Sequence, residues 1–195
     1  MKIIRHRRNT KLELLGTSTE FGIEVDIRSH GDALIIHHDP FTRGESFEEW
    51  LEAYAHKTLI LNVKEEGLEE RLLSLMRQRG IEDFFFLDQS FPFLVKTART
   101  GERRCAVRVS EYESVETALQ LAGMIDWVWV DCFTRFPLTA ADARRLRDAG
   151  LRLCLVSPEL QGRVDPNEIT AMRRLLSESE IVADAVCTKT PERWN

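Results

Sequence analysis

Residues 22–40 read GIEVDIRSHGDALIIHHDP, two apolar runs separated by the turn-like sequence SHGD. The first run, GIEVDIR at 22–28, alternates with the period of two that is typical of a β-strand. That period places Glu24 and Asp26 on the same face of the strand, so two carboxylates are expected side by side. The second run, ALIIHH at 33–38, predicts an element that extends the first strand or pairs beside it.

A regular alternation of short apolar runs and helical segments continues along the rest of the chain. Short apolar runs are each followed by a segment with helical periodicity, and this alternation indicates parallel α/β architecture. Besides residues 22–28, the predicted strands are 2–6, 58–64, 84–89, 105–110, 127–132, 151–157 and 184–189. The predicted helices are 46–56, 67–79, 91–100, 113–122, 139–149 and 166–178, with at most a short helix after the first strand.

Eight strands alternating with helices predict a compact (β/α)8 TIM-type barrel. Typical barrels of this kind need ~250 residues, so the loops of this 195-residue chain must be tight. An open doubly wound sheet is the alternative, but no glycine-rich phosphate turn follows the first predicted strand. No linker or repeat interrupts the pattern, and we expect a single domain over residues 1–195.

Two helix starts carry specific signals. Ser46, three residues before Glu49, predicts a capping box. Asp165 precedes Pro166 and predicts an N-cap followed by a proline at the first helical position.

The composition limits the classes of partner. The chain is 43% hydrophobic and 30% charged with a formal net charge of -5, which argues against general attraction to nucleic acid or to an anionic membrane. No signal-peptide pattern or membrane-length apolar stretch is present, so we expect a cytoplasmic protein without stable membrane insertion and leave its oligomeric state open. Four cysteines lie in apolar runs without CxxC spacing and predict buried thiols of a reduced compartment: Cys105, Cys132, Cys154 and Cys187.

Polar residues collect where the predicted strands end. His6 and Arg7 follow the first strand, His38 follows the second apolar run, and Asn62 and Lys64 end the 58–64 strand. In a parallel barrel this face holds the active site, because its loops bring different strands together. Further polar residues follow the later strands: Asp88, Arg108, Glu111, Asp131, Ser157 and Glu159.

The acidic pair requires compensation. Two inward carboxylates, Glu24 and Asp26, repel each other and lose hydration unless a positive group lies near them. A divalent cation with oxygen ligands, Mg or Ca, is the simplest compensation. Salt bridges are an equally weighted alternative, and the candidate cations are Arg5, Arg7, Arg28 and Lys64.

The two histidines at strand ends suggest acid-base chemistry. His6 and His38 could act as general acid and general base on opposite sides of one phosphorus atom, because histidine titrates near neutral pH. Arg7 and Lys64 could neutralise the phosphate oxygens. Arginine suits this role better, because its planar guanidinium can donate two parallel hydrogen bonds to one phosphate.

The order and spacing of these pieces resemble the glycerophosphodiester phosphodiesterase family, within the phosphatidylinositol-phospholipase-C-like barrels. The resemblance rests on HRRNT at 6–10, on Glu24-x-Asp26, and on His38-Asp39 after a short hairpin-like insertion. Weaker similarities, in LILNVK, QSFPFLVK and DAVCTKTPERW, extend it over essentially the whole chain.

The resemblance implies a metal-dependent hydrolase of a small glycerophosphodiester-like or phosphoglycan substrate. His6 and His38 would be the acid-base pair, Arg7 a phosphate-binding group, and Glu24 and Asp26 metal ligands. The chain departs from the family at three places. Asn62 replaces the family's third acidic ligand, Arg8 replaces a glycine, and CLVSPEL replaces a Trp-Thr motif. We therefore expect weaker metal binding, or help from another acid: Glu66, Asp88 or Asp131.

Two other functions are compatible with the same residues. A catalytically degenerate barrel could bind a phosphate ligand or act in regulation, with metal affinity lost through Asn62. A metal-independent lyase that forms a cyclic phosphate is less favoured, because Glu24 and Asp26 would then lack their cation.

Overall fold

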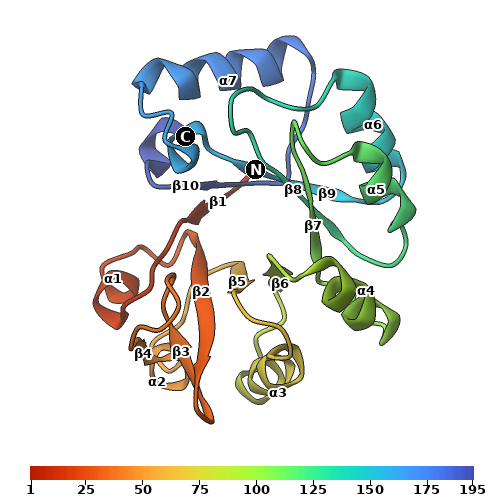
Figure 1. Cartoon of the computed structure of the whole chain (residues 1–195). Coiled ribbons are helices and arrows are strands. Elements are labelled where there is room, and N and C mark those ends of the chain that lie inside the picture. The colour runs from red at the N-terminus through yellow and green to blue at the C-terminus, as the bar shows by residue number, and fades with distance from the viewer.

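The computed structural model describes residues 1–195, and its main feature is a parallel β-barrel wrapped by helices (Figure 1). The eight parallel strands that form the barrel wall, here called staves, follow one another in the order β7-β8-β9-β10-β1-β2-β5-β6. Their bounds are β1 Lys2–Arg5, β2 Gly22–His30, β5 Leu59–Val63, β6 Phe84–Leu87, β7 Ala106–Val109, β8 Trp127–Val130, β9 Arg152–Val156 and β10 Ala185–Thr188. The predicted (β/α)8 fold class and its eight strands are confirmed.

The barrel closes between β6 and β7 through a single parallel bridge. That bridge joins Phe86 to Cys105, and the N–H of Phe86 donates to the carbonyl of Arg104 at 2.8 Å. The other neighbouring staves share continuous ladders, such as the one that pairs residues 23–27 of β2 with 59–63 of β5. The contact between β6 and β7 therefore has the least backbone pairing of any in the barrel wall.

The helices form the outer layer between successive staves (Figure 1). They are α1 Lys11–Leu15, α2 Phe47–Leu51, α3 Glu69–Arg79, α4 Phe91–Arg99, α5 Val115–Gln120, α6 Ala140–Asp148 and α7 Pro166–Glu178, with two 3-10 turns, η1 Pro158–Gln161 and η2 Pro191–Arg193. All the predicted helices are present, and α1 is the expected short helix after the first strand.

Helix α2 is much shorter than the predicted 46–56 helix. After Leu51 the N–H groups of Ala53 and Tyr54 bond carbonyls only three residues back, so the α-helix tightens and ends. The predicted capping box forms only in part, because the Ser46 hydroxyl accepts from the N–H of Glu49 at 3.3 Å but no reciprocal bond is present. The predicted N-cap at Asp165 is confirmed by its bond from the N–H of Asn167.

A hairpin is added to the barrel on the β2 side. Strand β2 continues beyond the barrel and pairs antiparallel with β3 (Ala33–Ile36), which pairs in turn with the short, unpredicted β4 (Glu45–Ser46). The predicted 33–38 element ends early, because Asp39 donates its N–H to Nδ1 of His37 and turns the chain. The N–H of His37 still reaches the carbonyl of Asp26 at 3.2 Å, so the returning strand ends beside the acidic pair.

The core has two parts separated by the barrel wall. Alternate residues of the staves fill the barrel interior, where Phe85 stacks on Trp127 with ring centroids 4.6 Å apart. The opposite residues pack outward against the helices. All four cysteines are buried and free, as predicted. Measured helix by helix, the chain offers no segment with the length and apolar character needed to cross a bilayer.

Candidate active site

The first loop at the mouth of the barrel is fastened to β2. The N–H of Arg7 donates to Oε2 of Glu24 at 2.7 Å, and the N–H of Arg8 donates to the Glu24 carbonyl at 3.0 Å. Asn9 makes two bonds with Asp26: Nδ2 donates to Oδ2 at 2.8 Å, and the N–H of Asp26 donates to Oδ1 at 3.1 Å. The segment that carries His6 is therefore held directly over the two acids.

The acidic pair is fully buried on the inner face of β2, as its spacing predicts. Glu24 and Asp26 both have an exposed fraction of 0%. Burial, and then the neighbouring charge of Asp26, raise the pKa of Glu24 to about 7. Hydrogen bonds from the Arg7 N–H and from Asn62 Nδ2, the latter at 2.8 Å, act in the opposite direction.

Two of the four candidate cations lie beside Asp26. Lys64 Nζ is 3.2 Å from Oδ1 and Arg7 Nε is 3.4 Å from Oδ2. The other two candidates point elsewhere, since Arg28 pairs with Glu65 and Arg5 donates to the carbonyl of Lys189. Protein cations therefore compensate Asp26 more directly than they compensate Glu24.

The ion pairs continue across the mouth of the barrel. Lys64 Nζ is also 3.1 Å from Asp88, whose other oxygen contacts the guanidinium of Arg108. Arg108 in turn lies 3.2 Å from Asp131. Burial raises the pKa of Asp88, but the nearby charges of Arg108 and Lys64 outweigh it and lower that pKa overall. We call this set the ion-pair chain; in order, it is Arg7, Asp26, Lys64, Asp88, Arg108 and Asp131.

His6 lies against the acidic pair as a neutral base. Its side chain is 12% exposed, and Nε2 is 3.8 Å from Oε2 of Glu24. Burial, and then the charges of Arg7 and Lys189, lower the pKa of His6 to about 3. Nδ1 is buried without a hydrogen-bond partner. The imidazole is therefore uncharged at neutral pH.

His38 lies on the rim, on the loop that follows β3. Its side chain is 41% exposed, and Nδ1 is 2.8 Å from Oδ1 of Asp39. The His38 carbonyl accepts two bonds from the Arg28 guanidinium, at 2.9 and 3.1 Å. The structure thus brings together His6, Arg7, Glu24, Asp26, Asn62 and Lys64, with His38 on the adjoining rim and in no ion pair with them.

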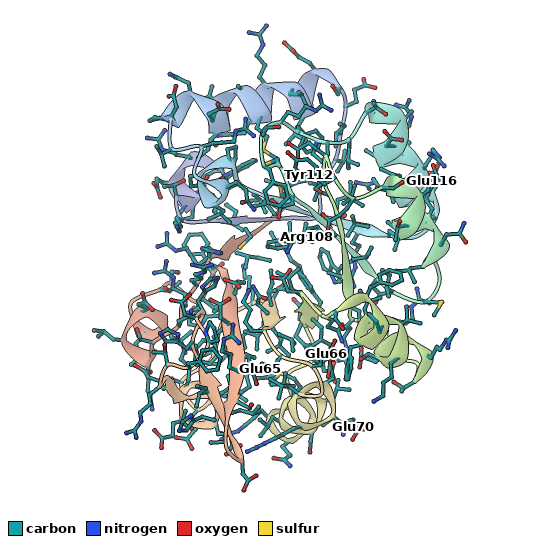
Figure 2. The ribbon with its side chains drawn as sticks, viewed as in Figure 1. Glu65, Glu66, Glu70, Arg108, Tyr112 and Glu116 are labelled. Atoms are coloured by element: carbon teal, nitrogen blue, oxygen red, sulfur yellow. The ribbon has the colours of Figure 1, made fainter.

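Some predicted polar residues are used to fasten loops. Glu111 accepts from the N–H groups of residues 133–135, and although burial opposes it, this set of bonds lowers its pKa to about 2. Glu159 accepts from the hydroxyls of Ser157 and Thr188 and so holds the closing turn of the chain. Glu66 is exposed on the loop after β5 (Figure 2). None of these three acids contacts Glu24 or Asp26.

Sequence reasoning missed two residues of the site. The HRRNT pattern contains Asn9 without indicating a role for it, although its amide is the main hydrogen-bond partner of Asp26. Lys189 directly follows β10 and acts on the pKa of His6, and no motif points to it. Its position after the last strand, the same signal that found His6 and Lys64, could have identified it.

Comparisons with known proteins identify the fold. No family model and no curated protein sequence matches the chain. A glycerophosphodiester phosphodiesterase from Agrobacterium tumefaciens superposes with a TM-score of 0.68 at 16% identity, over 99% of this chain and 98% of that one. A glycerophosphoryl diester phosphodiesterase from Parabacteroides distasonis gives 0.66 at 13% identity, over 98% and 84%. At these identities the likeness shows that the chain shares their barrel fold.

Proposed function

We propose that this chain belongs to the glycerophosphodiester phosphodiesterases and hydrolyses a small phosphodiester. The observation that carries the proposal is the buried pair Glu24 and Asp26 beneath a neutral His6, with Arg7 and Lys64 at the same barrel mouth. Two acids, a base and two cations at one barrel mouth are the parts that phosphodiester cleavage needs. The names of the two structures that share the fold point to the same chemistry.

The residues present fit a divalent cation. Asp26 Oδ1 and Asn62 Oδ1 are buried without hydrogen-bond partners, and they lie beside Glu24, whose pKa is raised by burial. Mg and Ca prefer such oxygen ligands, so Glu24, Asp26 and Asn62 would hold the ion. A bound cation would supply positive charge to the phosphoryl oxygens.

The fit also indicates modest affinity. No group of three or more His, Cys, Asp and Glu side chains is arranged to hold a metal ion. The third donor is instead the neutral amide of Asn62, and Lys64 Nζ lies within 3.2 Å of Asp26. The ammonium group of Lys64 would therefore have to move for the cation to bind.

The protein's own groups divide the remaining work. His6, kept neutral by burial, takes the proton of the attacking hydroxyl or water. His38, exposed on the rim with Asp39 on its Nδ1, protonates the leaving alcohol. Arg7, whose side chain is 40% exposed, and Lys64 neutralise the non-bridging oxygens of the phosphate.

Phosphorus NMR of glycerophosphodiester solutions tests this proposal. The wild type with Mg, Ca or Mn is expected to release a phosphomonoester, and EDTA to abolish the release. His38→Ala is expected to lose turnover about 100-fold or more with its fold intact. A folded wild-type protein inactive with every metal, or a fully active His38→Ala variant, would overturn the proposal.

A second candidate function is a phosphate-ligand binding or regulatory protein. It is favoured by one observation: Asn62 donates to Glu24 while Lys64 pairs with Asp26, so each acid has a partner without a metal ion. This candidate predicts calorimetric binding of a phosphodiester without turnover. A lyase would instead release a cyclic phosphate in the presence of EDTA.

A further inference from the structure

The barrel wall is weakest between β6 and β7, which are joined only by the Phe86–Cys105 bridge. Beyond the bridge the chain turns away at Asp88, which has a left-handed φ of 58°. A cleft of about 610 Å³ lies there, between α4 and the loop that leads from β7 to α5. Cavities of ~300–1,000 Å³ accept ligands much larger than glycerol.

The inner end of the cleft belongs to the barrel mouth. Asp88 and Arg108 line the cleft, and both are links of the ion-pair chain. In the ion-pair chain, Asp88 pairs with Lys64, which pairs in turn with Asp26. A phosphate group held by Arg7 and Lys64 therefore has the cleft as its neighbour, and a large alcohol esterified to that phosphate has room to extend into it.

Aromatic side chains line the cleft from two different elements. Phe91, in the first turn of α4, is 50% exposed, and Tyr112, on the loop after β7, is 77% exposed. The Tyr112 ring leans on Phe133 with centroids 5.8 Å apart. Figure 2 shows Tyr112 and Arg108, both from the β7 side of the cleft. Both rings therefore keep part of their flat apolar surface exposed at the cleft.

The rest of the lining is mixed: four residues are apolar, Leu87, Leu94, Ala106 and Val107, and four are polar, Gln89, Glu113, Ser114 and Thr117. Among the polar residues, Oε1 of Gln89 is buried without a hydrogen-bond partner. An acyl chain would cover the apolar residues but would leave Oε1 of Gln89 buried without a partner, which is costly. A flat ring with polar edges would stack on the aromatic side chains and bond the polar ones, as nucleobases do on aromatic platforms.

We propose that the cleft binds the second alcohol of the phosphodiester substrate, and that this alcohol carries a flat ring with polar edges, as a nucleoside does. The inference rests on the proposed function, because the cleft is assigned relative to a phosphate held by Arg7 and Lys64. Tyr112 supplies the stacking surface, and the polar residues at the start of α5 face the edge of the ring.

Two diesters with primary-alkyl leaving alcohols test the cleft: glycerophosphoethanolamine, and the diester of glycerol 3-phosphate with the 5′-hydroxyl of adenosine. Tyr112→Ala is expected to raise KM for the adenosine diester about tenfold, while kcat and all constants for glycerophosphoethanolamine stay within about twofold. Tyr112→Phe keeps the ring and should behave as wild type. Val164→Ala removes an exposed side chain outside the cleft and is the matched control.

Two results would overturn the cleft assignment. One is an unchanged KM for the adenosine diester in Tyr112→Ala. The other is a preference of the wild type for 1-acyl-glycerophosphoethanolamine that Tyr112→Ala removes, since the cleft would then hold an acyl chain. If the wild type cleaves neither diester, the proposed function is wrong. Calorimetric titration with the adenosine diester then decides the cleft, where equal Kd values for wild type and Tyr112→Ala overturn it.

Discussion

Oε2 of Glu24 accepts a 2.7 Å hydrogen bond from the backbone N–H of Arg7. Arg7 has a left-handed φ of 49°, a conformation that costs a non-glycine residue about 1 kcal/mol or more. The buried acid therefore also holds the strained loop that carries His6. Its protonation state and the order of the loop are linked, which makes the stability of the protein sensitive to pH.

Glu24→Gln should remove a stability term that changes with pH. The pKa of Glu24 is raised by burial to about 7 from 4.5, so the folded protein holds a proton that the unfolded chain releases. Stability is then lost as pH rises from about 4.5 to 7, by an upper bound of about 3 kcal/mol. Urea unfolding across this range should show a steeper fall for wild type than for Glu24→Gln. The exposed Glu70→Gln is the control, and parallel curves for wild type and Glu24→Gln would contradict the prediction.

His6 should remain uncharged through the neutral range. Burial lowers its pKa to about 3, so its ring resonances in NMR are expected to stay constant between about pH 5 and 8. The spectrum of His6→Gln assigns them by difference. A midpoint near 6.5 would show that His6 is solvated and charged like a free histidine, which contradicts its assignment as a neutral base.

Asn62→Glu should strengthen metal binding. A third carboxylate beside Glu24 and Asp26 adds charge to the oxygen ligands, and ligand charge tunes affinity for Ca and Mg. We expect the metal-free variant to be less stable, and its thermal midpoint to rise at metal concentrations about tenfold lower than for wild type. Asn62→Gln is the neutral control of matched length. Equal metal responses of the two variants would argue against an ion at this position.

Lys64→Met should destabilise the fold. Lys64 is 14% exposed and faces both Asp26 and Asp88, so its removal leaves the buried Asp26 and the half-buried Asp88 short of a partner. The expected loss is about 3 kcal/mol in the free energy of unfolding, and Lys64→Arg should recover most of it. The matched control is Lys57→Met, because the exposed Lys57–Glu20 pair should contribute less than about 1 kcal/mol. Similar losses at both lysines would mean that the ion-pair chain is a solvated surface feature.

The sequence alone was sufficient to predict the eight barrel strands and the placement of Glu24 and Asp26 on one face. The strand period alone put Glu24 and Asp26 on one face, and the structure places both inside the barrel. The length of α2 could not be predicted in the same way. It ends where Trp50 donates its indole N–H to the carbonyl of Arg8, a contact between segments more than 40 residues apart.

Sequence spacing also could not show which positively charged groups lie beside Glu24 and Asp26. Whether Lys64 turns toward Asp26 or away from it depends on where Asp88 and Arg108 lie, and these residues come from two other staves. The same holds for Lys189, which approaches His6 only because β10 pairs with β1. Sequence spacing predicts which face of one strand a residue occupies, whereas charge pairing across the mouth requires the whole barrel.

Hydrolysis of bis(p-nitrophenyl) phosphate by wild type and His6→Ala, with Mg, Ca or EDTA, tests the central claim most directly. Circular dichroism of both proteins first establishes that each is folded. We predict metal-dependent release of p-nitrophenol by the wild type and a loss of about 100-fold or more in His6→Ala. Full activity in His6→Ala, or no release with any metal by the folded wild type, would contradict the account of this barrel mouth as a phosphodiesterase site.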